Sequence, residues 1–226
     1  MKNKNYGILN LSLIDRLIEN KRTEMLNILQ NKIKNFTIES FLDIGTTEEN
    51  NLDSSNFFVK QFNNIKIKKS ISIQNIEKKN FTLFLKKSIT KDFLKNEIND
   101  YKSDLVVSSA TLEHVGSFEN QLKMMNNIIS LTNKVFFVTT PYRNFPIDFH
   151  TKLPLIHMLP KKIHRNILNF LNLKDYAKEE NLNLLDFTTL NKIINLLKLD
   201  NFEIIIVNLR LFGLISNIMI YGEKKL

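Results

Sequence analysis

Two short segments of the chain combine polar side chains that could do chemistry with a local sequence that could position them. The first spans residues 104–115. Its run of strand-forming residues ends on Ser108, Ser109 and Ala110, and a Glu-His pair follows shortly afterwards. Ligands of open α/β sheets bind outside the carboxyl ends of the strands, and small residues at such an end leave room beside the backbone. The segment therefore predicts both a fold class and the face that carries the chemistry.

The second segment surrounds His150, which follows Asp148, and it begins just after Tyr142 and Arg143. An imidazole has an unperturbed pKa near 6.5 and can accept a proton at neutral pH. His150 is therefore the candidate general base. Tyr142 and Arg143 are candidate substrate contacts, since a guanidinium can hold a carboxylate or phosphate. A packing role for His150 remains an open alternative.

Metal-binding patterns are missing from the sequence. The chain has no cysteine, and its four histidines form neither a His-x-x-x-His nor a His-Glu-x-x-His pattern. His157 and His164 are interpreted as surface or packing residues. We therefore expect no metal site and no disulfide.

The elements that must position these segments alternate between strands and helices. Apolar periodicity predicts helices over 8–34, 53–63, 91–99, 118–131 and 188–197. Strands are expected over 40–44, 69–74, 81–85, 104–108, 134–139, 202–207 and 217–221. No helix separates the last two strands, so they can pair directly only if they are antiparallel. The pattern predicts a doubly wound α/β fold whose mostly parallel seven-stranded sheet ends in an antiparallel C-terminal hairpin.

The domain organisation follows from the same pattern. We expect an N-terminal helical segment over 1–36 and an α/β domain over 37–226. Residues 141–185 interrupt the alternation and are expected to be an insertion. No internal repeat and no Gly/Ser- or Pro-rich linker divides the chain further.

Together with this strand plan, Asp43-Ile44-Gly45 and Leu112-Glu113-His114 resemble the class I S-adenosylmethionine-dependent methyltransferases. The likeness is greatest to the small-molecule branch with a type 11 methyltransferase domain, and it covers residues 38–140 and the final helix and hairpin. Residues 140–151 are also similar to an insertion of bacterial members associated with surface-polysaccharide gene clusters. The resemblance implies a Rossmann-like fold and S-adenosylmethionine as cofactor.

The resemblance also implies which residues touch that cofactor. They follow the first, second and fourth strands: Asp43, Gly45, Thr46, Gln74, Ser108, Ser109 and Ala110. Two features depart from the family pattern. Thr46 and Thr47 stand where further glycines are usual, and Gln74 stands where an acidic residue grips the ribose. Glu113 and His114 match a common pair of this branch, and a structural role is favoured for both.

The function that the resemblance implies is methyl transfer to a small-molecule or glycan-type acceptor, with a role in surface-polysaccharide biosynthesis as its most specific version. Two alternatives stay open. The missing glycines are compatible with a non-catalytic partner subunit, and the net charge of +9 is compatible with an RNA methyltransferase. The lysines are scattered through a composition rich in Asn and Ile, so a compositional origin of the charge is favoured and nucleic acid is not the expected partner.

The sequence also bears on location. No signal-peptide pattern is found, and no stretch reaches the ~20 apolar residues of a membrane-spanning helix. We expect a cytoplasmic protein. Residues 145–171 interleave apolar and basic side chains, which is compatible with contact at the inner membrane face, although a lid packed on the sheet is the preferred interpretation. The oligomeric state stays open.

Overall fold

A computed structural model describes residues 11–48, 55–76, 78–197, 199 and 201–225. Its centre is a seven-stranded sheet with the order β3-β2-β1-β4-β5-β7-β6. The strands are β1 (Ser40–Ile44), β2 (Ile67–Ser72), β3 (Leu83–Lys86), β4 (Ser103–Ser109), β5 (Thr132–Pro141), β6 (Phe202–Leu211) and β7 (Leu214–Lys224). The first five run parallel, and β7 pairs antiparallel with both β5 and β6. The predicted fold class is confirmed.

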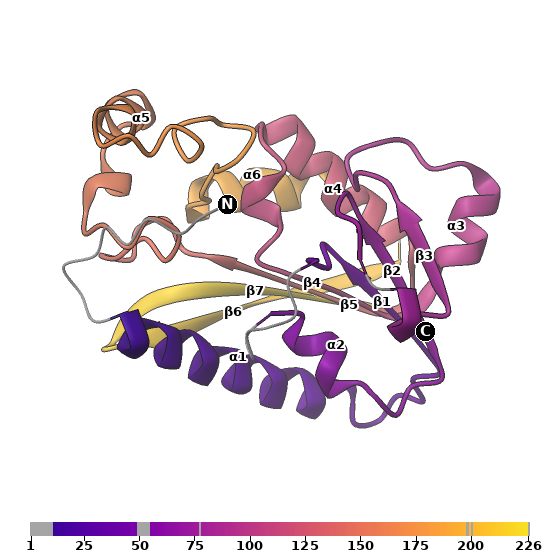
Figure 1. Ribbon diagram of the computed structural model, residues 1–226. Helices are drawn as coiled ribbons and strands as arrows, with labels where there is room; N and C mark the ends of the chain where they lie inside the picture. The colour runs from indigo at the N-terminus through magenta and orange to yellow at the C-terminus, as the bar shows by residue number, and fades with distance from the viewer. Residues whose placement is uncertain (1–10, 49–54, 77, 198, 200, 226) are drawn as a thin grey trace.

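Helices cover both faces of the sheet (Figure 1). On one face lie α1 (Leu11–Ile33) and α2 (Phe57–Gln61), and on the other lie α3 (Lys95–Tyr101), α4 (Phe118–Ser130) and α6 (Phe187–Leu196). The connection between β5 and α6 holds α5 (Lys161–Phe170). The short 3₁₀ turns are η1 (Lys78–Asn80), η2 (Leu112–His114) and η3 (Ile156–Met158).

Continuously apolar strands produce two hydrophobic cores, one on each face of the sheet. Successive side chains of a strand point to opposite faces. Phe41 and Phe137 are therefore buried against α1 and α2, while the adjacent Leu42 and Phe136 are buried against α4 and α6. The completely buried centre of β5 is what a central strand with helices on both faces requires.

The predicted first helix is α1, and the part of the prediction before Leu11 lies outside the described residues. Met25, Leu26, Leu29 and Ile33 make its buried side. The spacing of these residues places them on one helical stripe facing the sheet. The helix expected to start at Asp53 or Ser54 is described from Phe57, and both expected cap residues lie outside the described part.

The C-terminal hairpin is longer than the sequence pattern predicted. Strands β6 and β7 have 10 and 11 residues and pair up to Leu211 and Leu214. The turn between them uses Phe212 and Gly213, both with positive φ. Residues 208–211, beyond the strand predicted over 202–207, therefore extend the ladder, because a two-residue turn suffices for antiparallel strands.

The predicted insertion occupies the connection between Pro141 of β5 and Phe187 of α6. Its prolines separate short pieces, as expected from their missing N–H groups. Pro154 forms an isolated bridge with Ile147, and Pro160 is the residue before α5. Among the described helices, none is long and apolar enough to cross a membrane.

Candidate active site

Two neighbouring hollows lie at the carboxyl ends of the central strands. The first, called the β1–β4 hollow, has a volume of about 160 Å³, and its lining includes Asp43, Gly45, Ser109 and Ala110. The second, called the β5 hollow, has a volume of about 180 Å³ and is lined by residues that include Thr139, Phe149 and His150. Ser109, Ala110 and Arg22 line both hollows. The sheet edge predicted to carry the chemistry therefore holds two adjoining spaces that share a floor.

Gly45 ends β1 at the rim of the β1–β4 hollow, and two features require a glycine there. Its φ is +95°, and a Cβ atom at this position would lie 2.2 Å from Thr111 Oγ1. Thr111 itself precedes η2. The glycine thus lets the end of β1 pack closely on the segment that follows β4.

Asp43 is buried, and its carboxylate accepts a hydrogen bond from the Thr46 hydroxyl. Burial raises the pKa of Asp43 to about 6, and the Thr46 hydrogen bond offsets only part of that rise. The Thr46 hydroxyl also lies 2.7 Å from the Ser70 hydroxyl. The backbone carbonyl of Thr46 accepts a hydrogen bond from Ser72 Oγ at 2.6 Å. Thr46 therefore joins the ends of β1 and β2 rather than lining the β1–β4 hollow.

Gln74 and Ser108 also make local contacts. Gln74 Oε1 accepts from the backbone N–H of Glu48 at 2.8 Å, which ties the loops after β1 and β2 together. Ser108 is fully buried, and its hydroxyl donates to the carbonyl of Ile44 at 3.0 Å. Of the residues expected to touch the cofactor, Asp43, Gly45, Ser109 and Ala110 line the β1–β4 hollow, whereas Thr46, Gln74 and Ser108 do not.

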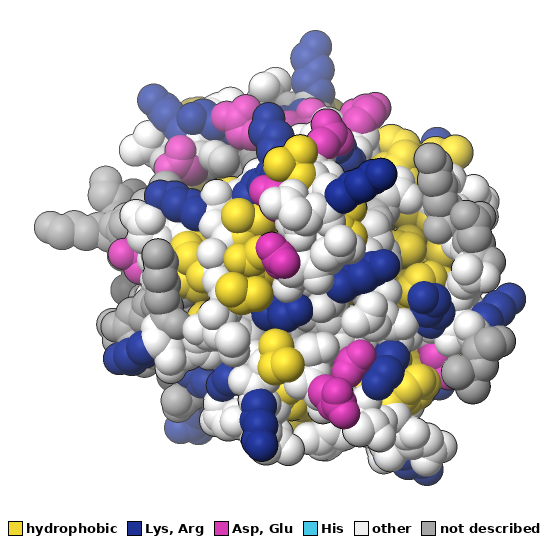
Figure 2. Space-filling view, turned by 90° about the vertical axis from the view of Figure 1, so that its right-hand side faces the viewer, with side chains coloured by type: hydrophobic (Ala, Val, Ile, Leu, Met, Phe, Trp, Pro, Cys, Tyr) yellow, Lys and Arg dark blue, Asp and Glu magenta, His cyan; other side chains and the backbone are white. Residues whose placement is uncertain are grey.

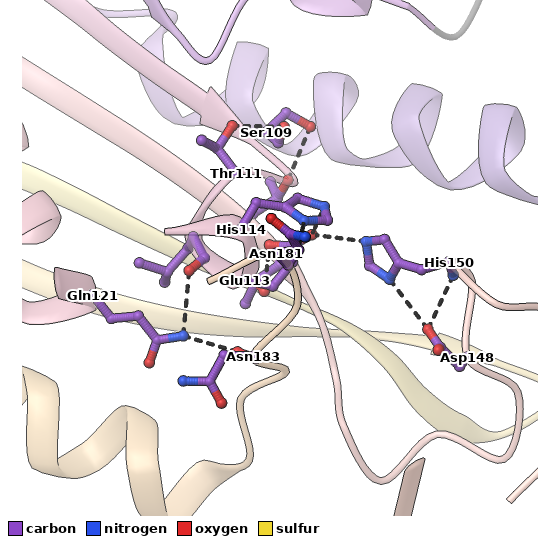
Figure 3. A network of polar contacts seen from close by, with 12 residues as sticks. Ser109, Thr111, Glu113, His114, Gln121, Asp148, His150, Asn181 and Asn183 are labelled. Atoms are coloured by element: carbon purple, nitrogen blue, oxygen red, sulfur yellow. Dashed lines mark hydrogen bonds and ion pairs between the residues drawn. The ribbon is translucent and has the colours of Figure 1, made fainter. Parts of the chain in front are cut away.

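His150 lies between two buried carboxylates (Figure 3). Its Nδ1 is 3.1 Å from Asp148 Oδ1, and its Nε2 is 3.5 Å from Glu113 Oε1. Burial lowers the pKa of the His150 imidazole, but Asp148 and Glu113 outweigh burial and raise that pKa to about 10. The two carboxylates therefore favour the protonated form of the His150 imidazole.

Glu113 and His114 join this group, which the sequence did not reveal. The Thr140 hydroxyl donates to Glu113 Oε2 at 3.0 Å, and the rings of His114 and His150 are 4.7 Å apart. One donor atom from each of Glu113, His114 and His150 lies within 4.8 Å of the others, so these side chains could hold a metal ion. Because 35 positions separate the pair from His150, only the tertiary fold brings them together.

Tyr142 and Arg143, the two candidate substrate contacts, lie at the start of the insertion and contact α6 and the rest of the insertion, respectively. The Tyr142 ring lies 4.7 Å from that of Phe187. The Arg143 guanidinium donates to the carbonyls of His157 at 3.2 Å and Leu159 at 2.8 Å. Neither residue is among those that line the two hollows.

His157 and His164 are both buried in the insertion, with ring centroids 6.4 Å apart. His157 Nε2 is 2.7 Å from the carbonyl of Phe145, which fixes one end of the insertion. Burial lowers the pKa of His164 to about 4. Their positions agree with the packing role that the sequence favoured.

Solved structures of other proteins resemble this fold. No protein-family model matches the chain, and no protein of curated function matches it. Magnesium protoporphyrin IX methyltransferase (ChlM) from Synechocystis PCC 6803, solved with bound SAH, has a TM-score of 0.54 and 11% identity, over 98% of this chain and 90% of that one.

Two further methyltransferases are similar in fold. The plantazolicin methyltransferase BamL, solved with a desmethyl substrate analogue and SAH, has a TM-score of 0.55 and 13% identity, over 95% of this chain and 91% of that one. The small RNA methyltransferase HEN1 has a TM-score of 0.59 and 12% identity, over 100% of this chain and 27% of that one. The strand order, the antiparallel β5-β7-β6 end and these likenesses show that the chain has the fold of the class I S-adenosylmethionine-dependent methyltransferases.

Proposed function

We propose that this protein is a methyltransferase that uses S-adenosylmethionine to methylate a small-molecule or glycan-type acceptor. The observation that carries the proposal is the pair of hollows that share Ser109 and Ala110 at the carboxyl ends of the parallel strands. Methyl transfer needs two bound molecules in line with each other. Two adjoining spaces with a common floor offer that arrangement.

The β1–β4 hollow suits the cofactor. It lies at the end of β1, where Asp43 and Gly45 meet Ser109 and Ala110 of the β4 end. S-adenosylmethionine supplies a methyl group on a sulfonium, which is a good leaving group. The protein has to align the acceptor with that methyl group and exclude water. Solved methyltransferases of this fold contain SAM or SAH.

The β5 hollow suits the acceptor. Phe149 and Met25 supply apolar walls, and the polar groups include those of His150, Asn217 and the cations Arg22 and Lys21. Arg22 also faces the β1–β4 hollow, and its cation could pair with a carboxylate or phosphate of either bound molecule. A phosphate-bearing acceptor, such as a nucleotide sugar or a glycan precursor, matches this combination. A role in surface-polysaccharide biosynthesis is the most specific form of the proposal.

His150 lines the β5 hollow, but Asp148 and Glu113 favour its protonated form. A role as general base therefore requires that the pKa of His150 fall when the β5 hollow is filled. Arg143 has a different role in the proposal, because its guanidinium holds the carbonyls of His157 and Leu159. It positions the insertion that carries His150.

Calorimetric titration with S-adenosylmethionine and S-adenosylhomocysteine tests the proposal. We expect both to bind, and we expect Ser109→Ile to weaken both by at least about tenfold, because the larger side chain fills the shared floor. Ser88→Ile is the matched control, since Ser88 is also partly buried but lines neither hollow. If the folded protein binds neither S-adenosylmethionine nor S-adenosylhomocysteine at millimolar concentration, the proposed methyltransferase function is wrong.

A screen of nucleotide sugars and glycan precursors with radiolabelled methyl donor then tests the acceptor. Transfer to one of them supports the enzyme. Cofactor binding without transfer to any acceptor class would favour the alternative of a non-catalytic partner subunit.

A further inference from the structure

Three donor atoms converge beside the β5 hollow. Glu113 Oε1 lies 3.5 Å from His150 Nε2 and 4.0 Å from His114 Nε2, and all three atoms lie within 4.8 Å of one another (Figure 3). Two of these residues come from η2 after β4 and the third from the insertion. The arrangement therefore depends on the docking of the insertion on the sheet.

Hydrogen bonds on the far side of each ring fix the state of the inward-facing nitrogens. His114 Nδ1 lies 2.6 Å from the carbonyl of Asn181, and His150 Nδ1 lies 3.1 Å from the Asp148 carboxylate. Both partners only accept, so each Nδ1 carries the proton. In the neutral rings, both Nε2 atoms present a lone pair towards Glu113. This is the orientation that outer partners impose on metal-binding histidines.

The third donor atom, Glu113 Oε1, is buried without a hydrogen-bond partner among the described residues. The Glu113 side chain is 0% exposed, and only its Oε2 is satisfied, by the Thr140 hydroxyl. A buried carboxylate oxygen without a partner is costly. A metal ion at this point takes the place of a proton on His150 Nε2, so that both rings bind it as neutral imidazoles and Glu113 Oε1 gains a cationic partner.

We propose that Glu113, His114 and His150 bind a divalent first-row transition metal such as Zn²⁺ or Co²⁺. Two imidazoles and one carboxylate are a ligand set typical of these ions, whereas Mg²⁺ and Ca²⁺ prefer oxygen ligands. Tetrahedral ligands at ~2.1 Å from a metal are about 3.4 Å apart. The Glu113–His150 separation of 3.5 Å already matches this. The Glu113–His114 separation of 4.0 Å and the His114–His150 separation, at most 4.8 Å, would have to shorten on binding. The proposal departs from the expectation of no metal, which rested on local spacing alone.

The site leaves a coordination position for a fourth ligand, as catalytic sites with three protein ligands do. Because His150 also lines the β5 hollow, that position faces the proposed acceptor. This role rests on the proposed function and takes the place of the general-base role of His150, because the metal then occupies His150 Nε2. An acceptor hydroxyl bound to the metal loses its proton more readily. Its oxygen then forms a bond to the methyl carbon while the carbon–sulfur bond of the sulfonium breaks, and the hydroxyl proton goes to solvent.

Metal binding is tested without cofactor or acceptor. The chelator-treated protein is titrated with Co²⁺ and Zn²⁺ by calorimetry and visible absorption. We expect one ion per chain and a Co²⁺ spectrum with nitrogen ligands. Glu113→Gln, His114→Ala and His150→Ala should each weaken binding by at least about tenfold. The matched controls are Glu119→Gln, an exposed carboxylate on α4, and His164→Gln on α5, and both should bind as the wild type does.

A positioning test uses Asp148, which holds the outer nitrogen of His150. Asp148→Asn should lower metal affinity by about 10- to 100-fold without removing a ligand. Thermal unfolding checks that each variant is folded. In the wild type, histidine-selective ¹⁵N NMR should show that the ion shifts the Nε2 signals of two of the four histidines, which requires no variant.

The site is refuted if the folded wild type binds no stoichiometric ion, or if the three ligand variants bind it as tightly as the controls. The titration with S-adenosylmethionine is a separate measurement. A protein that binds the metal but not the cofactor contradicts the proposed function and leaves the metal site standing. The reverse result contradicts the metal site alone.

Discussion

At the scale of single residues, Gly45 shows how closely the ends of β1 and β4 approach. The sequence assigned this glycine to backbone contact with a ligand, and the structure adds a packing reason, because a Cβ atom would meet Thr111. Substitutions at Gly45 therefore act on the fold as well as on any ligand. A binding experiment that changes only this residue cannot separate the two effects.

A double-mutant cycle separates them. We expect Gly45→Ala to destabilise the protein by about 1–3 kcal/mol, from positive φ and from the contact with Thr111. Thr111→Ala removes the nearest atoms, so the double variant should be more stable than the sum of the two single effects predicts. Chemical denaturation measures all four proteins. Strictly additive free energies would show that the contact with Thr111 costs nothing.

Asp43 gives a prediction about pH. Its pKa of about 6 in the folded protein exceeds the value of about 3.8 expected when unfolded. As pH rises from about 4 to about 6, the unfolded chain loses this proton while the folded chain keeps it, so stability falls. The contribution lost is about 3 kcal/mol, and it stays lost above pH 6.

Asp43→Asn should remove this part of the pH dependence, so that the stability of the variant relative to the wild type rises between pH 4 and pH 6. Denaturation curves at several pH values measure the difference, and Asp100→Asn, at an exposed position of α3, is the control. A difference that is constant over this range would contradict the raised pKa.

At the scale of elements, the insertion between β5 and α6 is held by Arg143. Its guanidinium binds two carbonyls of the insertion and lies 3.7 Å from Asp186, the N-cap of α6. A planar guanidinium can reach several acceptors at once, and a lysine ammonium does so less well. The Arg143 guanidinium therefore stabilises contacts inside the protein. From the sequence, this residue was predicted to contact the substrate.

We expect Arg143→Lys to destabilise the insertion by about 1–3 kcal/mol, through lost charge-assisted hydrogen bonds to the carbonyls of His157 and Leu159. Limited proteolysis should then cut within 145–171 faster than in the wild type. Arg165→Lys is the control, since Arg165 makes an ion pair with the exposed Glu179 at 3.3 Å. Equal cleavage rates for both variants would show that Arg143 does not hold the insertion.

Helix α5 and the turn before it expose apolar side chains beside basic ones. The exposed apolar residues are Leu155, Met158, Leu159, Ile163, Phe170 and Leu171, and Phe170 is 88% exposed. Lys161, Lys162 and Arg165 are on the same helix. We keep contact with an anionic membrane as a proposal for this surface, because such a mixture is typical of helices that lie at a membrane interface.

Vesicle flotation measures this contact. We expect the wild type to bind anionic vesicles at low salt, and we expect the double variant Ile163→Ser and Phe170→Ser to bind at least about tenfold more weakly, since burying each side chain contributes about 1.5–3 kcal/mol. If the wild-type protein does not float with anionic vesicles at low salt, the proposed membrane contact is wrong.

At the scale of the whole molecule, the net charge is +9, and the lysines and arginines are scattered along the chain. The face on the right-hand side of Figure 1 shows Lys and Arg side chains interspersed with acidic and hydrophobic ones (Figure 2). Nucleic-acid binders gather their positive charge in a patch or stripe. The charge on this face gives little support to an RNA acceptor, although one protein of similar fold is a small RNA methyltransferase.

We therefore expect weak RNA binding with a steep salt dependence. Single-stranded RNA should bind with a Kd above about 1 µM at 0.15 M salt, as for non-specific contacts. Saturating RNA should leave S-adenosylmethionine affinity unchanged. Filter binding and calorimetry measure both quantities. Tight, salt-resistant binding of one RNA would favour the RNA methyltransferase alternative.

The sequence by itself determined the architecture. Strand and helix periods, and the absence of a helix between the last two strands, predicted the seven-stranded sheet and its antiparallel end, because these signals are local in the chain. They also placed Ser109 and Ala110 at the edge where two hollows meet. Local signals could not give the length of the final hairpin, since ladder pairing depends on the partner strand.

Only the tertiary structure decided how the polar residues combine. Glu113 and His114 follow β4, His150 lies in an irregular insertion, and no sequence period connects them. Their convergence depends on contacts between distant segments, such as the hydrogen bond from Asn183 N–H to the Glu113 carbonyl at 2.7 Å. The fold thus places Glu113 and His114, at the end of the 104–115 segment, beside His150 of the insertion. The chemistry of these residues is fixed by burial and by neighbours that the linear sequence does not specify.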